Sequence, residues 1–334
     1  TVNEHALIIS NELDIMRKHV SATIRLLDDG ATIPFIARYR KEATGSLDEV
    51  AIRNIQLRHA ALNDLYKRRD YILKQLKEQK QLTPELKERI EATIDPAVLE
   101  DIYLPFKPRR ATRASMARER GLEPLAKMIM AQQLDDVESA ARRYVNDKVA
   151  DTDEAISGAA DIIAEWVSES EKARALVRSR FGRTAQISAK VVKGKEDEGA
   201  KYRNYFDYSE PLRLCHSHRY LAIRRGEDEG YLKVNISIDD EEMSERLQRM
   251  FVKPGASGAT AAVVRRAVND GYMRLLRPSI ENETAAIHKE KCDTAAIGMF
   301  ADNVRQLLMG SPLHGKRVLG IDPGFRTGCK VVAL

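Results

Sequence analysis

Residues 101–121 read DIYLPFKPRRATRASMARERG, a segment in which two prolines interrupt an otherwise helical sequence. Pro105 and Pro108 fix their own φ and disfavour helical geometry at the residues that precede them, Leu104 and Lys107. We therefore expect an extended, exposed stretch of backbone before the next helix begins. Two helical regions of the chain meet at this break.

The same segment concentrates positive charge, with one acid, Glu119, among its cations. We call residues 105–120 the basic strap; its cations are Lys107, Arg109, Arg110, Arg113, Arg118 and Arg120. Arginine binds phosphate oxygens through a two-pronged fork, and an extended segment can follow a nucleic-acid strand. The strap is therefore our candidate nucleic-acid-binding site. The alternative is that these cations are solvated, or are paired with acids elsewhere in the chain.

Composition limits the remaining possibilities. The chain has 334 residues, 55 basic and 50 acidic, and a net charge of +5. This length predicts two or more folded units, and the small net charge means that a nucleic-acid surface must be a local patch. The three cysteines are odd in number and far apart, which favours reduced thiols and a cytoplasmic location. No apolar run has the length of a membrane span, and the first residues do not resemble a secretion signal.

Short helices with clear ends are expected in the first 50 residues. Apolar residues from Ile8 onward follow one helical face, and Gly30 is a natural stop. Gly45 ends the next helix, and Ser46 with Glu49 is expected to form a capping box. Two helices around a Gly-Ser corner resemble a helix-turn-helix, although most such corners serve only packing.

Residues 50–79 carry apolar side chains at helical spacing, which predicts one long amphipathic helix or a broken pair. The polar face of this segment is notably basic. Thr83 before Pro84 and Asp95 before Pro96 each predict an N-cap followed by proline in the first helical turn.

The chain beyond the strap continues mostly as helices, which we expect at 241–251, 256–276 and 279–309. The aromatic-rich segment 201–238 mixes tyrosines with arginines, a composition that suits base stacking but is more typical of a core with a basic rim. Alternating apolar residues at 232–238 predict a strand. The predicted fold class is therefore mainly α, with one minor strand region before the C-terminal segment.

The C-terminal segment RVLGIDPGFRTGCKVVAL reads as a strand, a turn and a second strand. Asp322 lies at the end of the first strand, where RNase H-like nucleases hold their first metal ligand. One carboxylate cannot hold the paired ions of that chemistry, so any catalytic site is incomplete in this chain.

Other chemistry has little support. Cys215, His216 and His218 are close in sequence, and His288 lies one helical turn from Cys292, but no sequence feature brings the two groups together as a zinc site. The chain has no Walker loop, no G-x-G-x-x-G and no G-x-S-x-G. We therefore predict no metal, no cofactor and no small-molecule substrate.

Four blocks of the sequence resemble, in order, the bacterial transcription accessory protein Tex family. They are TIPFIARYRKEATGSLDEV, YLPFKPRRATRA with ARERGLEPLA, SHRYLAIRRGEDEGYL, and VLGIDPGFRTGCKVVAL. The resemblance implies a helical N-terminal region with helix-turn-helix units, followed by a YqgF-type RNase H-like domain, a helix-hairpin-helix domain and an OB-fold RNA-binding domain. It also implies that the RNase H-like domain lacks the full catalytic set. In place of the family's usual unbroken basic run after Lys-Pro, this chain has Ala111.

These observations predict three regions: a helical region with the strap at 1–125, a second helical region at 126–315, and the first strands of a truncated YqgF/RNase H-like domain at 316–334. The predicted function is a non-enzymatic scaffold that binds RNA or DNA in transcription, independently of sequence. One alternative is a nuclease or junction resolvase that uses Asp322 with carboxylates beyond Leu334. The other is a protein-interaction scaffold whose basic faces contact the transcription machinery.

Overall fold

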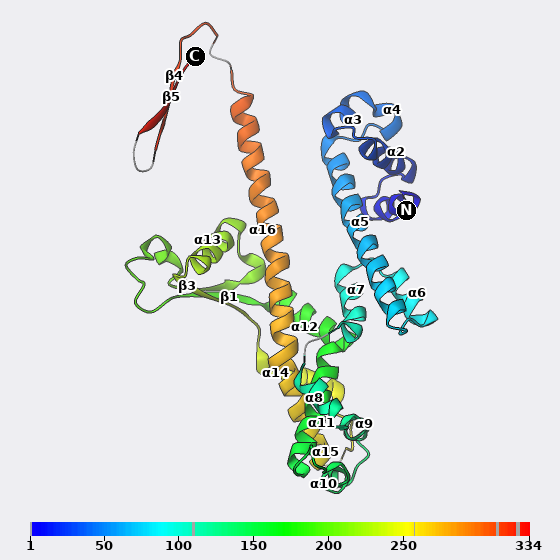
Figure 1. Ribbon diagram of the computed structural model, residues 1–334. Helices are drawn as coiled ribbons and strands as arrows, with labels where there is room; N and C mark the ends of the chain where they lie inside the picture. The colour runs from blue at the N-terminus through cyan, green and yellow to red at the C-terminus, as the bar shows by residue number, and fades with distance from the viewer. Residues whose placement is uncertain (1, 109–110, 257, 312–313, 325–327) are drawn as a thin grey trace. The chain divides into compact units, whose positions relative to one another are not determined.

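The structure is a computed structural model that describes residues 2–108, 111–256, 258–311, 314–324 and 328–334 (Figure 1). The chain forms two compact units. Unit 1 consists of residues 1–177 with 241–277, and unit 2 consists of residues 178–240 with 278–334. Most described residues are helical, which confirms the mainly α fold class. The domain ranges drawn from the sequence, 1–125, 126–315 and 316–334, remain predictions.

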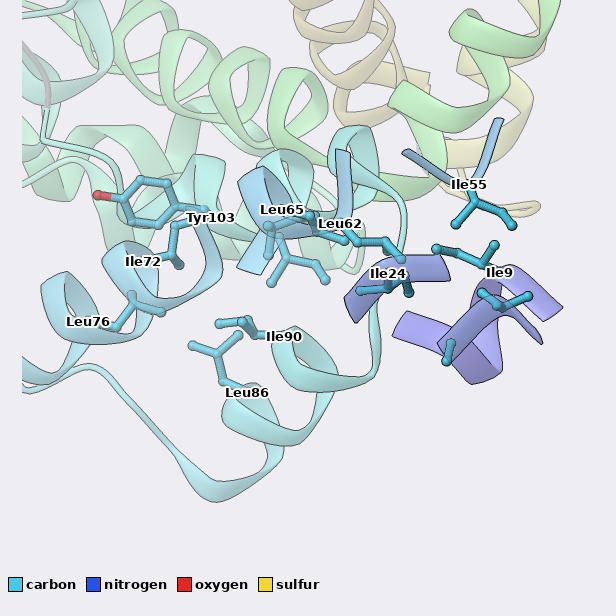
Figure 2. Packing of buried hydrophobic residues seen from close by; sticks show 14 residues of the cluster. Ile9, Ile24, Ile55, Leu62, Leu65, Ile72, Leu76, Leu86, Ile90 and Tyr103 are labelled. Atoms are coloured by element: carbon cyan, nitrogen blue, oxygen red, sulfur yellow. The ribbon is translucent and has the colours of Figure 1, made fainter. Parts of the chain in front are cut away.

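Unit 1 begins with a helical array around one long helix, α5 (Figure 1). Its helices are α1 (Val2–Leu13), α2 (Arg17–Asp28), α3 (Ile33–Tyr39), α4 (Lys41–Thr44), α5 (Glu49–Glu78), α6 (Pro84–Ala92) and α7 (Pro96–Tyr103). The predicted 50–79 segment is thus one unbroken helix. Its buried stripe packs against α1, α2, α6 and α7, as Figure 2 shows for side chains such as Leu62, Ile72 and Leu76.

Local capping explains where several of these helices start. The side chain of Thr83 accepts a hydrogen bond from the backbone N–H of Leu86, and that of Asp95 accepts one from Ala97. Proline follows in the first turn in both helices, so both predicted N-caps are confirmed. Gly30 has a φ of +85°, which a residue with a side chain rarely adopts, and it follows the end of α2 as expected.

Two local predictions in this region were wrong. The apolar face that starts at Ile8 belongs to two helices, because the chain turns at Asp14, whose φ is +53°. Ser46 also has a positive φ, and the N-cap of α5 is Asp48, whose carboxylate accepts from the N–H of Ala51. A carboxylate at the N-terminus also suits the helix dipole. The helices do meet at a Gly-Ser corner, but DNA reading by that corner remains a prediction.

The rest of unit 1 is a second helical group around α11 (Thr152–Glu169). Its other elements are α8 (Arg113–Glu119), α9 (Glu123–Ala131), α10 (Val137–Ala141), α14 (Asp240–Phe251), α15 (Gly258–Asp270) and the π-helical segment η5 (Gly271–Leu276). Apolar side chains along one face of α11 are buried, including Ile156 and Ile163, and Trp166 lies half-buried beside them.

Unit 2 contains an antiparallel sheet of order β2-β1-β3, with β1 (Gln186–Val191), β2 (Asp207–Pro211) and β3 (Leu232–Ser237). Strand β3 was predicted; β1 and β2 were not. Helices α13 (Ser217–Asp228) and α16 (Arg277–Leu308) belong largely to this unit, and α12 (Glu171–Thr184) spans the boundary between the two units. Tyr202 and Tyr220 are buried, so these two tyrosines of the aromatic-rich segment belong to the core.

The C-terminal residues form an antiparallel hairpin of β4 (Leu319–Pro323) and β5 (Cys329–Ala333), as the strand-turn-strand pattern predicted. In this hairpin Asp322 pairs in register with Lys330. None of the helices that the structure describes is long and apolar enough to cross a membrane.

Candidate nucleic-acid interface

The strap begins in a short 3-10 turn rather than in extended backbone. Segment η1 (Leu104–Phe106) follows α7 directly, and Leu104 has helical dihedrals because the N–H of Lys107 donates to its carbonyl, 3.4 Å away. The expectation that Leu104 is extended was therefore wrong. Lys107, with a ψ of 127°, is extended as predicted.

The second half of the strap forms a well-capped helix, α8. Thr112 is the N-cap of α8: its hydroxyl accepts from the N–H of Ser115, and the Ser115 hydroxyl accepts from the N–H of Thr112. This reciprocal pair of hydrogen bonds fixes the direction in which α8 begins. The same Thr112 hydroxyl donates to Glu165 Oε2 on α11, which ties the strap to the second helical group.

The two cations at the end of the strap pair with acids of unit 1. Arg118 Nη1 lies 2.7 Å from Glu165 Oε1, and Glu165 is only 6% exposed. Arg120 Nη1 lies 2.7 Å from Glu154 Oε1 at the start of α11. Because Glu165 is buried, releasing Arg118 to a phosphate would leave a buried carboxylate with less compensation. These two arginines therefore attach α8 to α11.

Lys107 is only weakly paired. Its Nζ lies 3.6 Å from Glu100, and Arg68 already binds the same carboxylate through two N–H groups. The hydrogen bonds from Arg68 are the main reason why the pKa of Glu100 is lowered. The Lys107 side chain remains 48% exposed, so it can turn to another anion at little cost.

Arg113 is the best-placed cation of the strap that the structure describes. It is exposed in the first turn of α8, and no carboxylate of the described residues lies within ion-pair distance of it. Burial raises the pKa of nearby Asp161, while the positive charges of Arg274 and Arg113 act in the opposite direction. Arg109 and Arg110 lie outside the described residues.

A cavity of about 400 Å³ lies between the strap and α11. Lys107 and Arg118 line it together with Glu119, Glu165 and Glu169. Among the described lining residues, these three acids outnumber the two bases. Among the described residues of the strap, Lys107 and Arg113 offer exposed cationic groups outside the close ion pairs with Glu165 and Glu154.

Asp101, the first residue of the segment 101–121, has a structural role that the amino-acid sequence did not indicate. Its carboxylate lies 2.5 Å from Arg174 Nε on α12, and both side chains are buried. The partners are 73 residues apart, so no local spacing could have predicted the pair.

A second group of cations lies elsewhere in unit 1. Four lysines from α5, α6 and the turn between them line one groove: Lys74, Lys77, Lys80 and Lys87. Lys74 and Lys77 belong to the basic polar face that the sequence shows in residues 50–79. The groove itself depends on how α6 folds back against α5.

The candidate metal ligands do not form a site. In unit 2 the His288 ring lies 4.6 Å from that of Tyr220, and burial lowers the pKa of His288 while the backbone of nearby Cys215 acts in the opposite direction, so the two groups do approach each other. Burial raises the pKa of Cys215 to about 12 and also raises that of Cys292. No cluster of three or more His, Cys, Asp or Glu residues suited to a metal occurs among the described residues, and Asp322 is exposed.

Comparison with known proteins identifies the family. The model described as Tex central region-like matches residues 132–300, and the model described as Tex-like protein N-terminal domain matches residues 3–77. This chain belongs to the Tex family. The lysine groove extends across the end of the N-terminal Tex match, since Leu73, Lys74 and Lys77 lie within it and Lys80, Leu82 and Lys87 lie beyond it, and the strap lies between the two matched regions.

Individual proteins of similar sequence support this family assignment. The transcriptional accessory protein Tex of Neisseria gonorrhoeae is 39% identical over 335 residues, covering 97% of this chain and 43% of the relative. Protein tex of Bordetella pertussis is 39% identical, covering 99% and 44%. The human S1 RNA-binding domain-containing protein 1 is 27% identical, covering 93% and 32%. The chain thus spans less than half the length of these curated relatives.

Proposed function

We propose that this chain is a nucleic-acid-binding scaffold of a transcription accessory factor, and that it holds RNA or DNA by the phosphate backbone on the outer side of the strap. The observation that carries the proposal is the contrast within the strap. Arg118 and Arg120 form close ion pairs with acids of α11. Arg113, by contrast, is exposed, and Lys107 has only a long ion pair with Glu100. Lys107 and Arg113 flank Arg109 and Arg110, so these four form the proposed contact set.

The names of the relatives support a role of this class. The Neisseria gonorrhoeae relative is named as a transcriptional accessory protein, and the human relative is named for an S1 RNA-binding domain. Phosphate contacts fix a protein on a nucleic acid without reading bases, and the strap offers arginine and lysine with no aromatic side chain beyond Phe106. Binding through the strap is therefore expected to be independent of sequence.

The test is a triple substitution, Arg109→Ala, Arg110→Ala and Arg113→Ala. Affinity for single-stranded RNA and DNA is measured by fluorescence anisotropy over a series of salt concentrations, starting at low salt. Each lost phosphate contact flattens the slope of log affinity against log salt by roughly 0.7 to 0.9, so we expect a total change of about 2 to 3. Affinity is expected to fall by a similar factor for every sequence.

A matched control removes the same charge elsewhere in unit 1: Arg53→Ala, Lys67→Ala and Lys127→Ala, all at exposed positions. The control is expected to keep the parent's salt slope, and both variants are expected to keep its melting temperature. If the strap variant retains both the parent's affinity and its salt slope, the strap does not contact phosphates and the proposal is wrong.

A further inference from the structure

The groove between α5 and α6 is a strongly cationic concave surface of unit 1. It has a volume of about 710 Å³ and is lined by Leu73, Lys74, Lys77, Lys80, Leu82 and Lys87. The turn that joins α5 to α6 contributes Lys80 and Leu82 to the lining. Nearby core residues of the same two helices, Leu76, Leu86 and Ile90, are labelled in Figure 2. All four lysines are exposed, and the two leucines are half-buried against the core.

Carboxylates of this chain do little to balance these lysines. Lys87 lies 3.7 Å from Glu91 in a pair whose side chains are both about half exposed, and such pairs contribute little. Lys74, Lys77 and Lys80 have no ion pair with any residue that the structure describes. The groove therefore presents a concentrated positive potential to solvent.

Helix electrostatics explain only part of this arrangement. Lys77 and Lys80 lie near the C-terminus of α5, where a cation is favoured by the helix dipole. Lys87 belongs to the N-terminal half of α6, where the dipole does not favour a cation. The clustering of all four lysines around one groove is thus not accounted for by stabilisation of the two helices alone.

The lining distinguishes between classes of anionic partner. Leu73 and Leu82, which are half-buried against the core, form the apolar part of the lining, which we call the floor, and neither an arginine nor an aromatic residue is among the lining residues described. A nucleic acid would gain nothing from leucines on the floor and would find no ring to stack on. A peptide with acidic side chains and apolar anchors would use both the lysine rim and the leucine floor.

We propose that this lysine groove is a docking site for an acidic protein segment that inserts apolar side chains between Leu73 and Leu82 while its carboxylates contact the four lysines. The proposal is independent of nucleic-acid binding by the strap. It gives the chain a second partner of a different chemical class.

The experiment uses three fluorescent probes. The first is a short, glutamate-rich synthetic peptide with leucines at helical spacing (i, i+3, i+7); the second has serine in place of each leucine; the third is a single-stranded oligonucleotide of equal charge. We expect the leucine peptide to bind most tightly. The double variant Lys74→Glu with Lys77→Glu is expected to weaken that binding by roughly tenfold, because each reversal turns an attraction into a repulsion.

The matched control, Lys67→Glu with Lys127→Glu, reverses two exposed lysines of unit 1 outside the groove and is expected to leave peptide affinity nearly unchanged. The strap triple variant is also expected to bind the peptide normally, which separates this proposal from the one above. The proposal is overturned if the serine peptide binds as well as the leucine peptide, or if the groove variant binds like the parent. Tighter binding of the oligonucleotide, lost in the groove variant, would instead make the groove a nucleic-acid surface.

Discussion

Glu165 shows how one buried carboxylate decides the role of a neighbouring arginine. It lies on α11 at 6% exposure, and Arg118 donates to one of its oxygens while Thr112 donates to the other. Removing one partner of a buried pair leaves an uncompensated charge, which is far more costly than losing an exposed pair. Arg118 is thereby committed to structure, whereas Arg113, five residues earlier, remains available for binding.

A buried histidine pair makes unit 1 sensitive to acid. His5 Nδ1 lies 2.9 Å from His59 Nδ1, and the His5 ring stacks on Tyr66 with centroids 4.8 Å apart. Burial first, and the nearby His59 second, lower the pKa of His5 from 6.5 to about 4. The unfolded chain therefore binds a proton at this residue at a pH where the folded chain does not.

It follows that the contribution of His5 to stability is complete above pH 6.5 and is lost as the pH falls from 6.5 towards 4. We expect the melting temperature to fall through this window, and His5→Gln to reduce that fall because its side chain does not titrate. His314→Gln, at an exposed position, is the control and is expected to follow the parent. Parallel pH profiles for the parent and His5→Gln would contradict the prediction.

At the scale of elements, the π-helical segment η5 depends on a close approach between two backbones. Gly271 is buried against α11, and a Cβ at this position would lie 2.5 Å from the carbonyl oxygen of Ala164. Backbone atoms cannot move aside as the end of a flexible side chain can. The absence of a side chain at residue 271 is what allows η5 to pack directly on α11.

Substituting Gly271→Ala is therefore expected to destabilise the chain by about 1 to 3 kcal/mol, the usual cost of overpacking a core. Gly298→Ala is the matched control: it lies in the exposed part of α16, where a Cβ would meet nothing within 4 Å. There, alanine is expected to stabilise by roughly 0.5 to 1 kcal/mol, because glycine is the poorer helix former. Urea unfolding measures both, and equal stability of Gly271→Ala and the parent would show that η5 can shift away from α11.

At the scale of the whole molecule, the chain builds two compact units from interleaved segments, since residues 241–277 return to unit 1 after the sheet of unit 2 is complete. The C-terminal hairpin places Asp322 at an exposed position opposite Lys330. A neighbouring lysine disfavours a cation at that carboxylate, and two-metal chemistry needs several acidic ligands around it.

We therefore expect this chain by itself not to cleave RNA or DNA when Mg²⁺ or Mn²⁺ is added, and Asp322→Asn to behave as the parent does. Incubation with end-labelled RNA and DNA, followed by gel electrophoresis, checks this. Cleavage by the parent that disappears in Asp322→Asn would instead favour the nuclease alternative.

The sequence alone was sufficient for features that depend on neighbouring residues. The N-caps at Thr83 and Asp95, the helical character of the segment Glu49–Glu78 and the strand at Leu232–Ser237 all rest on interactions or periodicities within a few residues. Caps and amphipathic patterns are local, so a sequence displays them directly. The four resemblance blocks added the family, which the comparisons confirm.

Some errors arose even at short range, where two residues compete for one role. Ser46 and Asp48 both resemble an N-cap, and Asp48 has the role because the corner holds Ser46 at a positive φ. Strand β1 was missed although Ile187 and Ala189 alternate with polar residues, because six residues of weak alternation are hard to separate from a helix end.

Only the tertiary structure decided which cations are available. Arg118 meets Glu165 across 47 positions of the chain, and Arg174 meets Asp101 across 73, so no spacing rule could assign these arginines to structure rather than to binding. The lysine groove likewise exists because α6 folds back on α5 and brings Lys87 to the same surface as Lys74. Charge is visible in a sequence, but pairing and concavity depend on distances that only folding sets.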